Sequence, residues 1–339
     1  MNIDFVVMWV DGNDLSWQDK MLSYKGTSEQ SNPTRFRDWN IFKYWFRSIE
    51  RFAPWVHRVF LITDNQIPSW ININYSKLKI IDHKDFIPAE YLPTFNSHTI
   101  ELNIHRIEGL SEYFVVFNDD TFINAPITPE YYFKNGLPCD APFEHIFTPR
   151  CYFPEVDMWG INIIEFCDTQ VVNAHFNRKE VTKANPKGWY GSYLGWKYRL
   201  QAYIIRLFGR TEFQHFYSPH NERPFLKYIF EEAWKEEGRM LCNSCTRFRE
   251  NVSLNLYFMR YWQLASNKFY PENSIMQKQV VQLATSSLSL LESKLNDTNI
   301  KSLCVNDSSL CDYEDYMQAK PLVRNLFEKK LPHKSSFEL

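Results

Sequence analysis

The stretch YFVVFNDD, Tyr113–Asp120, is an apolar run that stops abruptly on the three polar side chains of Asn118, Asp119 and Asp120. Such a run is typical of a strand buried on both faces of a parallel sheet. Asn and Asp also close strands by hydrogen bonding to their own backbone, so turn chemistry alone explains this ending. In an α/β sheet, however, ligands bind beyond the carboxyl ends of the strands, and two carboxylates there suit a divalent cation. The rest of the chain has to separate these two interpretations.

Other runs in the first 125 residues resemble this one. The apolar stretch FVVMWV, residues 5–10, is followed by the turn sequence DGND, and HRVFLITDN, residues 57–65, also finishes on polar side chains. A third run, KLKIIDH, covers residues 77–83. The spacing of apolar residues predicts helices over 39–53 and 96–110. Strands alternating with helices predict a mostly parallel, Rossmann-like α/β sheet, in which the strand-ending carboxylates share one rim. This favours the ligand-binding interpretation of Asp119 and Asp120.

Two clusters of possible metal ligands lie elsewhere. On the helix over 96–110, the side chains of His98, Glu101 and His105 share a face, so a metal site is geometrically possible, but a solvated polar face is the simpler interpretation. Four thiols, in two pairs, form a zinc site only if the pairs meet in space, and we favour free thiols. The pairs are Cys242 with Cys245 and Cys304 with Cys311.

The sequence pattern predicts that the second half of the chain is rich in helices. Helices are predicted near 224–237, 252–265, 274–296 and 316–329, the last followed by a polar, Lys-rich tail. We divide the chain into a nucleotide-sugar-binding Rossmann-like part (1–133), a helix-rich acceptor and catalytic part (134–300) and a C-terminal segment that closes the same catalytic domain (301–339).

An amphipathic helix is predicted over residues 195–210, GWKYRLQAYIIRLFGR. Its apolar residues share one face, and Arg199, Arg206 and Arg210 lie opposite. The favoured interpretation is a surface helix that packs its apolar face on the core. The alternative is a helix that lies on a membrane surface. The apolar residues are Trp196, Leu200, Tyr203, Ile204, Leu207 and Phe208.

The amino-acid composition argues against several classes of protein. The net charge of −2 argues against a nucleic-acid partner, and no dinucleotide or P-loop glycine motif is present. Seven cysteines, an odd number, suit reduced thiols in the cytoplasm. No stretch approaches the ~20 apolar residues that span a bilayer. We therefore expect a cytoplasmic protein, with peripheral contact to the inner face of the membrane through 195–210 or the tail as a further possibility.

Five stretches resemble, in order along the chain, the conserved regions of the Stealth family, which includes bacterial capsular and cell-wall polysaccharide phosphotransferases. The catalytic core of the animal N-acetylglucosamine-1-phosphotransferase is a distant relative. The stretches are DFVVMWVDGNDLSW, RDWNIFKYWFRSIERFAPWVHRVFLITDNQIPSW, LPTFNSHTIELNIHRIEGLSEYFVVFNDD, PHNERPF with FEEAW and RFRENVS, and LCVNDSSLCDYED.

The resemblance implies a glycosyltransferase-A-like fold and transfer of a hexose 1-phosphate from a UDP-sugar to a hydroxyl of an oligosaccharide or lipid-linked glycan acceptor, with release of UMP. Carried over by position, its catalytic residues fall on Glu101, Asp120, His220 and Arg249. Nucleotide-sugar binding falls on Asp11, Gly12, Asn13, Arg37 and Asn118. A Mg²⁺ or Mn²⁺ ion is expected on Asp119, Asp120 and Asp307.

These residue types suit the expected reaction. Displacement at phosphorus is catalysed mainly by positioning and charge neutralisation, which acids holding a metal and an arginine on the phosphate oxygens provide. His220 is the candidate base, with Glu101 as its competitor. One alternative is a metal-dependent glycosyltransferase that attacks the anomeric carbon and releases UDP. Another is a non-catalytic sugar-binding component of a polysaccharide assembly complex.

Overall fold

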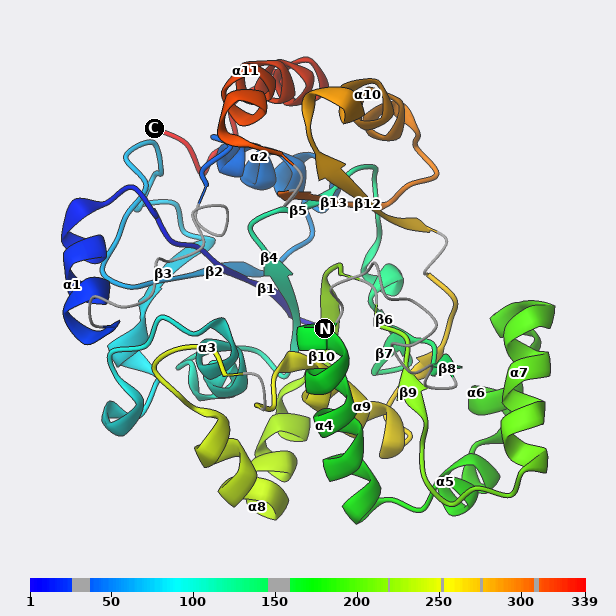
Figure 1. The fold of residues 1–339 in the computed structure, drawn as a ribbon. Helices are drawn as coiled ribbons and strands as arrows, with labels where there is room; N and C mark the ends of the chain where they lie inside the picture. Colours follow the sequence, from blue (N-terminus) through cyan, green and yellow to red (C-terminus); the bar gives the residue numbers. More distant parts are fainter. Residues whose placement is uncertain (26–36, 146–158, 219, 251–252, 275–276, 308–310) are drawn as a thin grey trace.

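The centre of the molecule is a five-stranded sheet in the order β10-β4-β1-β2-β3 (Figure 1). The computed structural model describes residues 1–25, 37–145, 159–218, 220–250, 253–274, 277–307 and 311–339. The strands of the central sheet are β1 (Ile3–Met8), β2 (Arg58–Thr63), β3 (Leu78–Asp82), β4 (Tyr113–Asn118) and β10 (Arg223–Leu226). All neighbours are parallel except β10, which runs antiparallel to β4. The expected mostly parallel α/β sheet is therefore confirmed.

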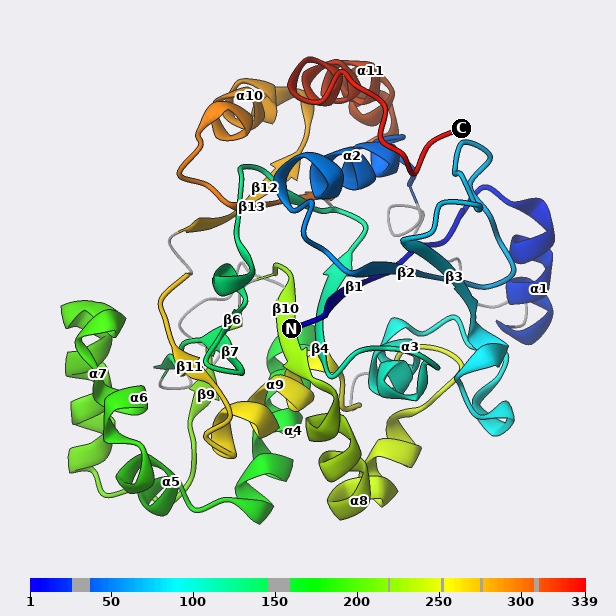
Figure 2. The same cartoon turned by 180° about the vertical axis from the view of Figure 1, so that it is seen from behind.

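Helices cover the sheet on two sides (Figures 1 and 2). On one side lie α2 (Phe42–Phe52), α10 (Leu288–Asn296) and α11 (Tyr313–Lys330), and on the other lie α3 (Ser97–Asn103), α4 (Trp159–His175), α8 (Lys227–Ser244) and α9 (Leu256–Ala265). Helix α1 (Leu15–Lys25) lies at the β3 edge. Helices α5 (Arg178–Ala184), α6 (Pro186–Tyr190) and α7 (Gly195–Leu207) form the opposite edge of the molecule.

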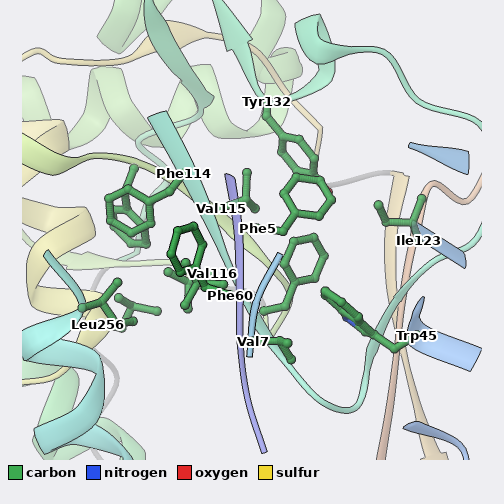
Figure 3. Close-up of a cluster of buried hydrophobic side chains, with 14 of the residues drawn as sticks. Phe5, Val7, Trp45, Phe60, Phe114, Val115, Val116, Ile123, Tyr132 and Leu256 are labelled. Carbon is green, nitrogen blue, oxygen red and sulfur yellow. The ribbon is translucent and has the colours of Figure 1, made fainter. Parts of the chain in front are cut away.

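The register brings the carboxyl ends of the central strands together. Met8 at the end of β1 pairs with Asn118 at the end of β4 and with Ile62 near the end of β2. The central strands are apolar on both faces because both faces are covered by helices. Figure 3 shows the resulting core, with Phe5 and Trp45 among its labelled side chains. The ring centroids of Phe5 and Phe117 lie 4.8 Å apart, and the Trp45 ring meets Phe117 edge-on.

Asp119 and Asp120 form the turn between β4 and β5 (Thr121–Ile123), and so join two sheets. The second sheet has the order β12-β13-β5, with β12 at Lys278–Leu283 and β13 at Ser302–Asp307. The helix expected over 274–296 is therefore wrong in its first half. In KQVVQL, Val281 and Leu283 alternate with exposed neighbours, which is the two-residue period of a strand. Further short strands are β6 (Phe133–Lys134), β7 (Leu137–Asp140), β8 (Glu144–His145), β9 (His215–Phe216) and β11 (Tyr270–Pro271).

The C-terminal tail packs on the core. Phe337 is buried, and the guanidinium of the buried Arg47 on α2 donates to both carboxylate oxygens of Glu338, at 2.8 and 2.9 Å. One hydrophobic core contains Phe5, Trp262 and Phe327, which come from each of the three segments assigned above. The division of the chain at 133 and 300 stays a prediction.

Three expectations for side chains change. The apolar face of α7 does not pack on the core, because all six of its apolar residues named above are exposed. His98 and His105 are buried, so the face they share with Glu101 is not a solvated one. The two cysteine pairs lie in different surroundings. The Cys245 thiol accepts a hydrogen bond from the Asn103 amide, whereas the Cys304 thiol donates one to Asp120. Within the described residues the four thiols form no common metal cluster.

His105 is the basis of a prediction about acid stability. Its ring lies 5.8 Å from that of Phe230 and 6.0 Å from that of Trp234, and burial first, then Arg106 and Lys227, lowers its pKa to about 3. Unfolded His105 takes up a proton near pH 6.5, so the folded state is stabilised fully above that pH and loses this contribution as the pH falls towards 3. Between pH 7 and 5 the loss amounts to about 2 kcal/mol. Urea unfolding should show that difference between the wild type and His105→Phe, and parallel pH dependences would contradict it.

Candidate active site

A cleft of about 460 Å³ opens at the carboxyl ends of the central strands. Its walls come from the ends of β1, β2 and β4, the start of α3, the start of α9 and the segments around His220 and Arg249. Four aromatic side chains contribute to its lining: Trp9, Trp17, Phe95 and Tyr257. The position agrees with the general rule for ligand sites in open α/β sheets.

The cleft brings together all four residues expected to be catalytic. Glu101, Asp120, His220 and Arg249 line it, although they are separated by up to about half of the chain. Asp119 and Asn118 line it as well. Their roles in catalysis and binding stay predictions, but their convergence in one cleft is a feature of the structure.

Asp120 is held by neighbours from two strands. Its Oδ1 accepts from Thr121 Oγ1 at 3.1 Å, and its Oδ2 accepts from Cys304 Sγ at 3.5 Å. The backbone carbonyl of Asp120 accepts from the Val305 amide at 2.9 Å, which ties the turn to β13. Burial, and next the charge of Asp120, raises the pKa of the Cys304 thiol, so this thiol is a donor near neutral pH. The carboxylate is therefore fixed while one side remains directed at the cleft.

His220 lies beside Asp120. The distance from His220 Nε2 to Asp120 Oδ2 is 3.8 Å, and Nε2 lies 3.3 Å from the Asn118 side-chain nitrogen. The His220 side chain is 44% exposed, so a substrate hydroxyl can reach it. Its proximity to a carboxylate is the arrangement in which an imidazole accepts a proton and is then stabilised as a cation.

Glu101 and Arg249 form a second polar group in the lining of the cleft. Glu101 Oε2 accepts from the Leu256 amide at 3.2 Å, and Arg249 Nη2 donates to Ser97 Oγ at 2.7 Å. Burial raises the pKa of Glu101, while the charges of Arg249, Arg223 and His220 act in the opposite direction. The group thus combines a desolvated carboxylate with cations suited to phosphate oxygens.

Asp119 is a desolvated carboxylate next to a second carboxylate, Asp120. Burial first, and the adjacent Asp120 charge second, raises the pKa of Asp119 to about 7. Two neighbouring carboxylates of this kind are stabilised by a cation, and carboxylate oxygens suit Mg²⁺ and Mn²⁺. In the described residues one group of three possible metal ligands lies within 4.8 Å of one another: Asp120, His220 and Cys304. A divalent ion therefore fits the donors around Asp120.

Several expected binding residues lie outside the cleft lining. Asp11, Gly12 and Asn13 follow Val10, which does line it, and Asp11 Oδ1 accepts from the Asn13 amide within their own turn. Arg37 donates to the Cys311 carbonyl at 2.7 Å and pairs with Asp307 at 3.7 Å, and neither Arg37 nor Asp307 lines the cleft. Ser308 and Ser309 of the VNDSS stretch lie outside the described residues. Direct contact of these side chains with donor or metal stays a prediction.

The structure adds residues that sequence reasoning did not select. Arg223 lines the cleft, with its guanidinium 4.2 Å from the Tyr257 ring centroid. His98, which the sequence suggested only as part of a helix-face metal site, also lines the cleft, and its Nδ1 lies 2.9 Å from Ser253 Oγ. Arg223 lies in the NERPF stretch, so its nearness to His220 in sequence was an available signal. Cys304 was considered from the sequence only as one of four possible zinc ligands. Nothing in the sequence indicated its position here, because only the pairing of β13 with β5 places its thiol beside Asp120.

The fold and this acid- and arginine-lined cleft define an α/β enzyme with a site suited to a phosphorylated ligand. Comparison with known proteins identifies the group to which it belongs. A family model for conserved region 2 of Stealth proteins matches residues 35–139. The chain belongs to the Stealth family, and the expected family resemblance is confirmed.

Curated relatives can be aligned with nearly the whole chain. Exopolysaccharide phosphotransferase cps2G of Lactiplantibacillus plantarum is 38% identical over 99% of this chain and 96% of its own length. Capsular polysaccharide phosphotransferase WcwK of Streptococcus pneumoniae is 38% identical, with 99% of both chains covered. Receptor polysaccharide phosphotransferase WefC of Streptococcus gordonii is 35% identical at the same coverage. This chain is therefore an enzyme of the phosphotransferase class.

Among solved structures, the galactosyltransferase LgtC in complex with donor and acceptor sugar analogues matches 98% of both chains, with 8% identity and a TM-score of 0.40. Overlap at this level does not assign an activity. No helix in the described part of the chain is long and apolar enough to cross a bilayer.

Proposed function

We propose that this enzyme transfers hexose 1-phosphate from a UDP-sugar to a hydroxyl of a glycan acceptor in capsular or cell-wall polysaccharide synthesis, forming a phosphodiester and releasing UMP. The observation that carries the proposal is the convergence of Asp119, Asp120, His220, Arg249 and Glu101 in one cleft of a chain whose full-length relatives are polysaccharide phosphotransferases.

The bond changes follow from the donor's chemistry. The acceptor oxygen forms a bond to the β-phosphorus, and the bond from that phosphorus to the oxygen bridging to the α-phosphate breaks. UMP leaves with the electron pair. His220 takes the proton of the acceptor hydroxyl, because its Nε2 is accessible and lies beside the Asp120 carboxylate. Glu101 is the second candidate base, since its raised pKa brings it closer to neutral pH.

The cationic residues of the cleft bind and orient the diphosphate. Arg249 is held by Ser97, which leaves the rest of its guanidinium fork for phosphate oxygens. Arg223 lies at the same cleft and adds positive charge. The aromatic rings of Trp9 and Trp17 offer apolar faces to uracil or hexose. These contacts supply positioning and charge neutralisation, on which phosphoryl transfer depends.

The acid pair would hold Mg²⁺ or Mn²⁺ through Asp119 and Asp120, with His220 and Cys304 within reach of the same point. The ion would neutralise charge on the donor diphosphate. A cation there would also favour the ionised form of Asp119, against the burial and repulsion that raise its pKa.

We place the reaction in the cytoplasm. The six cysteines in the described residues are all free thiols, and two of them, Cys242 and Cys167, are at least partly accessible. Free thiols of this kind persist in a reducing compartment.

The proposal predicts metal-dependent release of UMP. Purified protein is incubated with Mg²⁺ or Mn²⁺, a panel of UDP-hexoses and a crude polysaccharide acceptor, and the released nucleotide is identified by ion-exchange chromatography. UMP should be formed, and EDTA should lower the rate by on the order of a hundredfold or more, with recovery on adding excess metal. Release of UDP would instead indicate attack at the anomeric carbon, that is, a glycosyltransferase. Full activity in EDTA would show that the reaction needs no divalent metal ion.

A further inference from the structure

Helix α7 lies at the edge of the molecule opposite α1 (Figures 1 and 2). It exposes six large apolar side chains. The side chains of Leu207, Phe208 and Trp196 are 85%, 74% and 72% exposed. Leu200, Tyr203 and Ile204 are exposed between them. Their spacing of three and four residues puts all six on one side of the helix. Large apolar side chains gathered in this way mark an interaction surface, unlike scattered ones.

The opposite side of α7 is the one that attaches it to the protein. Ile205 is buried, and the ring of Tyr198 lies 4.1 Å from that of Phe143. The Arg206 guanidinium lies over the Tyr190 ring of α6, at 5.4 Å from its centroid. Because these contacts fix the helix from behind, the apolar face is held outward. Tyr203, at the border of this face, stacks on the Tyr190 ring of α6 with 5.4 Å between centroids, whereas Trp196, Leu207 and Phe208 stay largely exposed.

Basic residues surround this face. Lys197 and Arg210 are exposed near either end of the helix. Arg206 is exposed at the border of the apolar stripe although its guanidinium lies over the Tyr190 ring, and Arg199 beside it is partly exposed. The neighbouring helices α5 and α6 add lysines at 179, 183 and 187, against the single acid Glu180. This concentration of positive charge belongs to a chain whose net charge is −2. Apolar and aromatic side chains bordered by Lys and Arg are the pattern of a helix that lies in the interface of an anionic bilayer.

We infer that α7 docks this enzyme on an anionic lipid surface, with its apolar face inserted among the headgroups and the basic residues on lipid phosphates. A second copy of the chain is a poorer occupant. In a symmetric dimer through this face the same patch would meet itself, so the flanking arginines of the two copies would lie close together. A bilayer supplies the opposite charge together with an apolar layer.

Membrane docking also implies that the acceptor is a lipid-linked glycan, because a docked enzyme works beside substrates anchored in the same membrane. This conclusion about the acceptor rests on the proposed function. Docking itself does not depend on the reaction. It is therefore measured without donor or acceptor, so that its failure and a failure of the proposed function are separate results.

The test is co-sedimentation of the full chain with vesicles of phosphatidylglycerol and phosphatidylcholine, compared with phosphatidylcholine alone. The wild type should bind the anionic vesicles, and less so at high salt. The double variant Leu207→Ser/Phe208→Ser should weaken binding by on the order of a hundredfold. Lys197→Gln/Arg210→Gln should weaken it by about tenfold or more.

A matched control is Met317→Ser/Leu322→Ser on α11, which removes two apolar side chains that are 52% and 45% exposed on another face. This control should bind like the wild type.

All variants alter exposed side chains, and circular dichroism checks their folding. Absence of wild-type binding to anionic vesicles, or equal binding by Leu207→Ser/Phe208→Ser, would overturn the inference. Concentration-dependent self-association that this variant abolishes, without vesicle binding, would assign the face to a second copy instead.

Discussion

Asp120→Asn is expected to lower kcat by about a hundredfold to a thousandfold, the effect of removing one preorganised charged group from a phosphoryl-transfer site. Asn keeps the shape of the side chain, so the contacts from Thr121 and Cys304 can largely persist, while the negative charge beside His220 is lost. The loss should appear in kcat measured at saturating donor and metal.

The control for Asp120→Asn is Glu108→Gln, which neutralises an exposed acid in the turn that precedes β4 and does not line the cleft. This variant should keep wild-type kinetics. Urea unfolding of both variants separates a catalytic effect from a folding defect. A near-wild-type kcat for a folded Asp120→Asn protein would remove Asp120 from the mechanism.

Arg249→Met is expected to lower kcat/KM by on the order of a hundredfold or more, because it removes the guanidinium fork that Ser97 orients at the cleft. Arg249→Lys should recover only part of the activity, since an ammonium keeps the charge without the fork. Arg249 also lowers the pKa of Glu101. Its loss should therefore raise that pKa and move the acidic limb of the pH profile of kcat/KM to higher pH, if ionised Glu101 is required.

Arg247→Met is the matched control for Arg249→Met. Arg247 lies two residues away, donates to the Pro93 carbonyl and packs over the Tyr24 ring, and it does not line the cleft. Its replacement should leave kcat/KM within a few-fold of the wild type. Equal losses in both variants would assign the effect to the local fold of this segment.

The central sheet was predictable because its strands are near-continuous apolar runs that end in polar residues. The run YFVVFNDD forms β4 and its turn. The run ending near Asp11 forms its parallel neighbour β1, and the run ending near Asp64 forms β2, which pairs in parallel with the other edge of β1. Their carboxyl ends share one edge, as parallel pairing requires, so the placement of Asp119 and Asp120 in a cleft was predictable from local sequence. Convergence of His220 and Arg249 followed only from the family resemblance, since no periodicity links positions so far apart.

Other features depend on tertiary structure that local patterns do not encode. The β12 strand was taken for helix because KQVVQL is short and gains its stability from pairing with β13. The α7 helix was predicted correctly, but an amphipathic pattern does not indicate which face meets the core, and here Ile205 rather than the apolar stripe is buried. Asp307 meets Arg37 instead of the cleft because β13 directs Asn306, not Asp307, towards it.

The fate of the donor's β-phosphate distinguishes transfer of hexose 1-phosphate from transfer of hexose alone. A UDP-hexose labelled with ³²P at the β-phosphate is supplied with metal and acceptor, and the polymer is separated from the nucleotides. UMP alone could also arise from hydrolysis of the donor, whereas label in the polymer requires that phosphorus itself is transferred. For a hexose-1-phosphate transferase, the label should enter the glycan in a phosphodiester, in equal amount to the UMP released. Label that remains in UDP while unlabelled hexose enters the glycan would contradict the proposed transfer of hexose 1-phosphate.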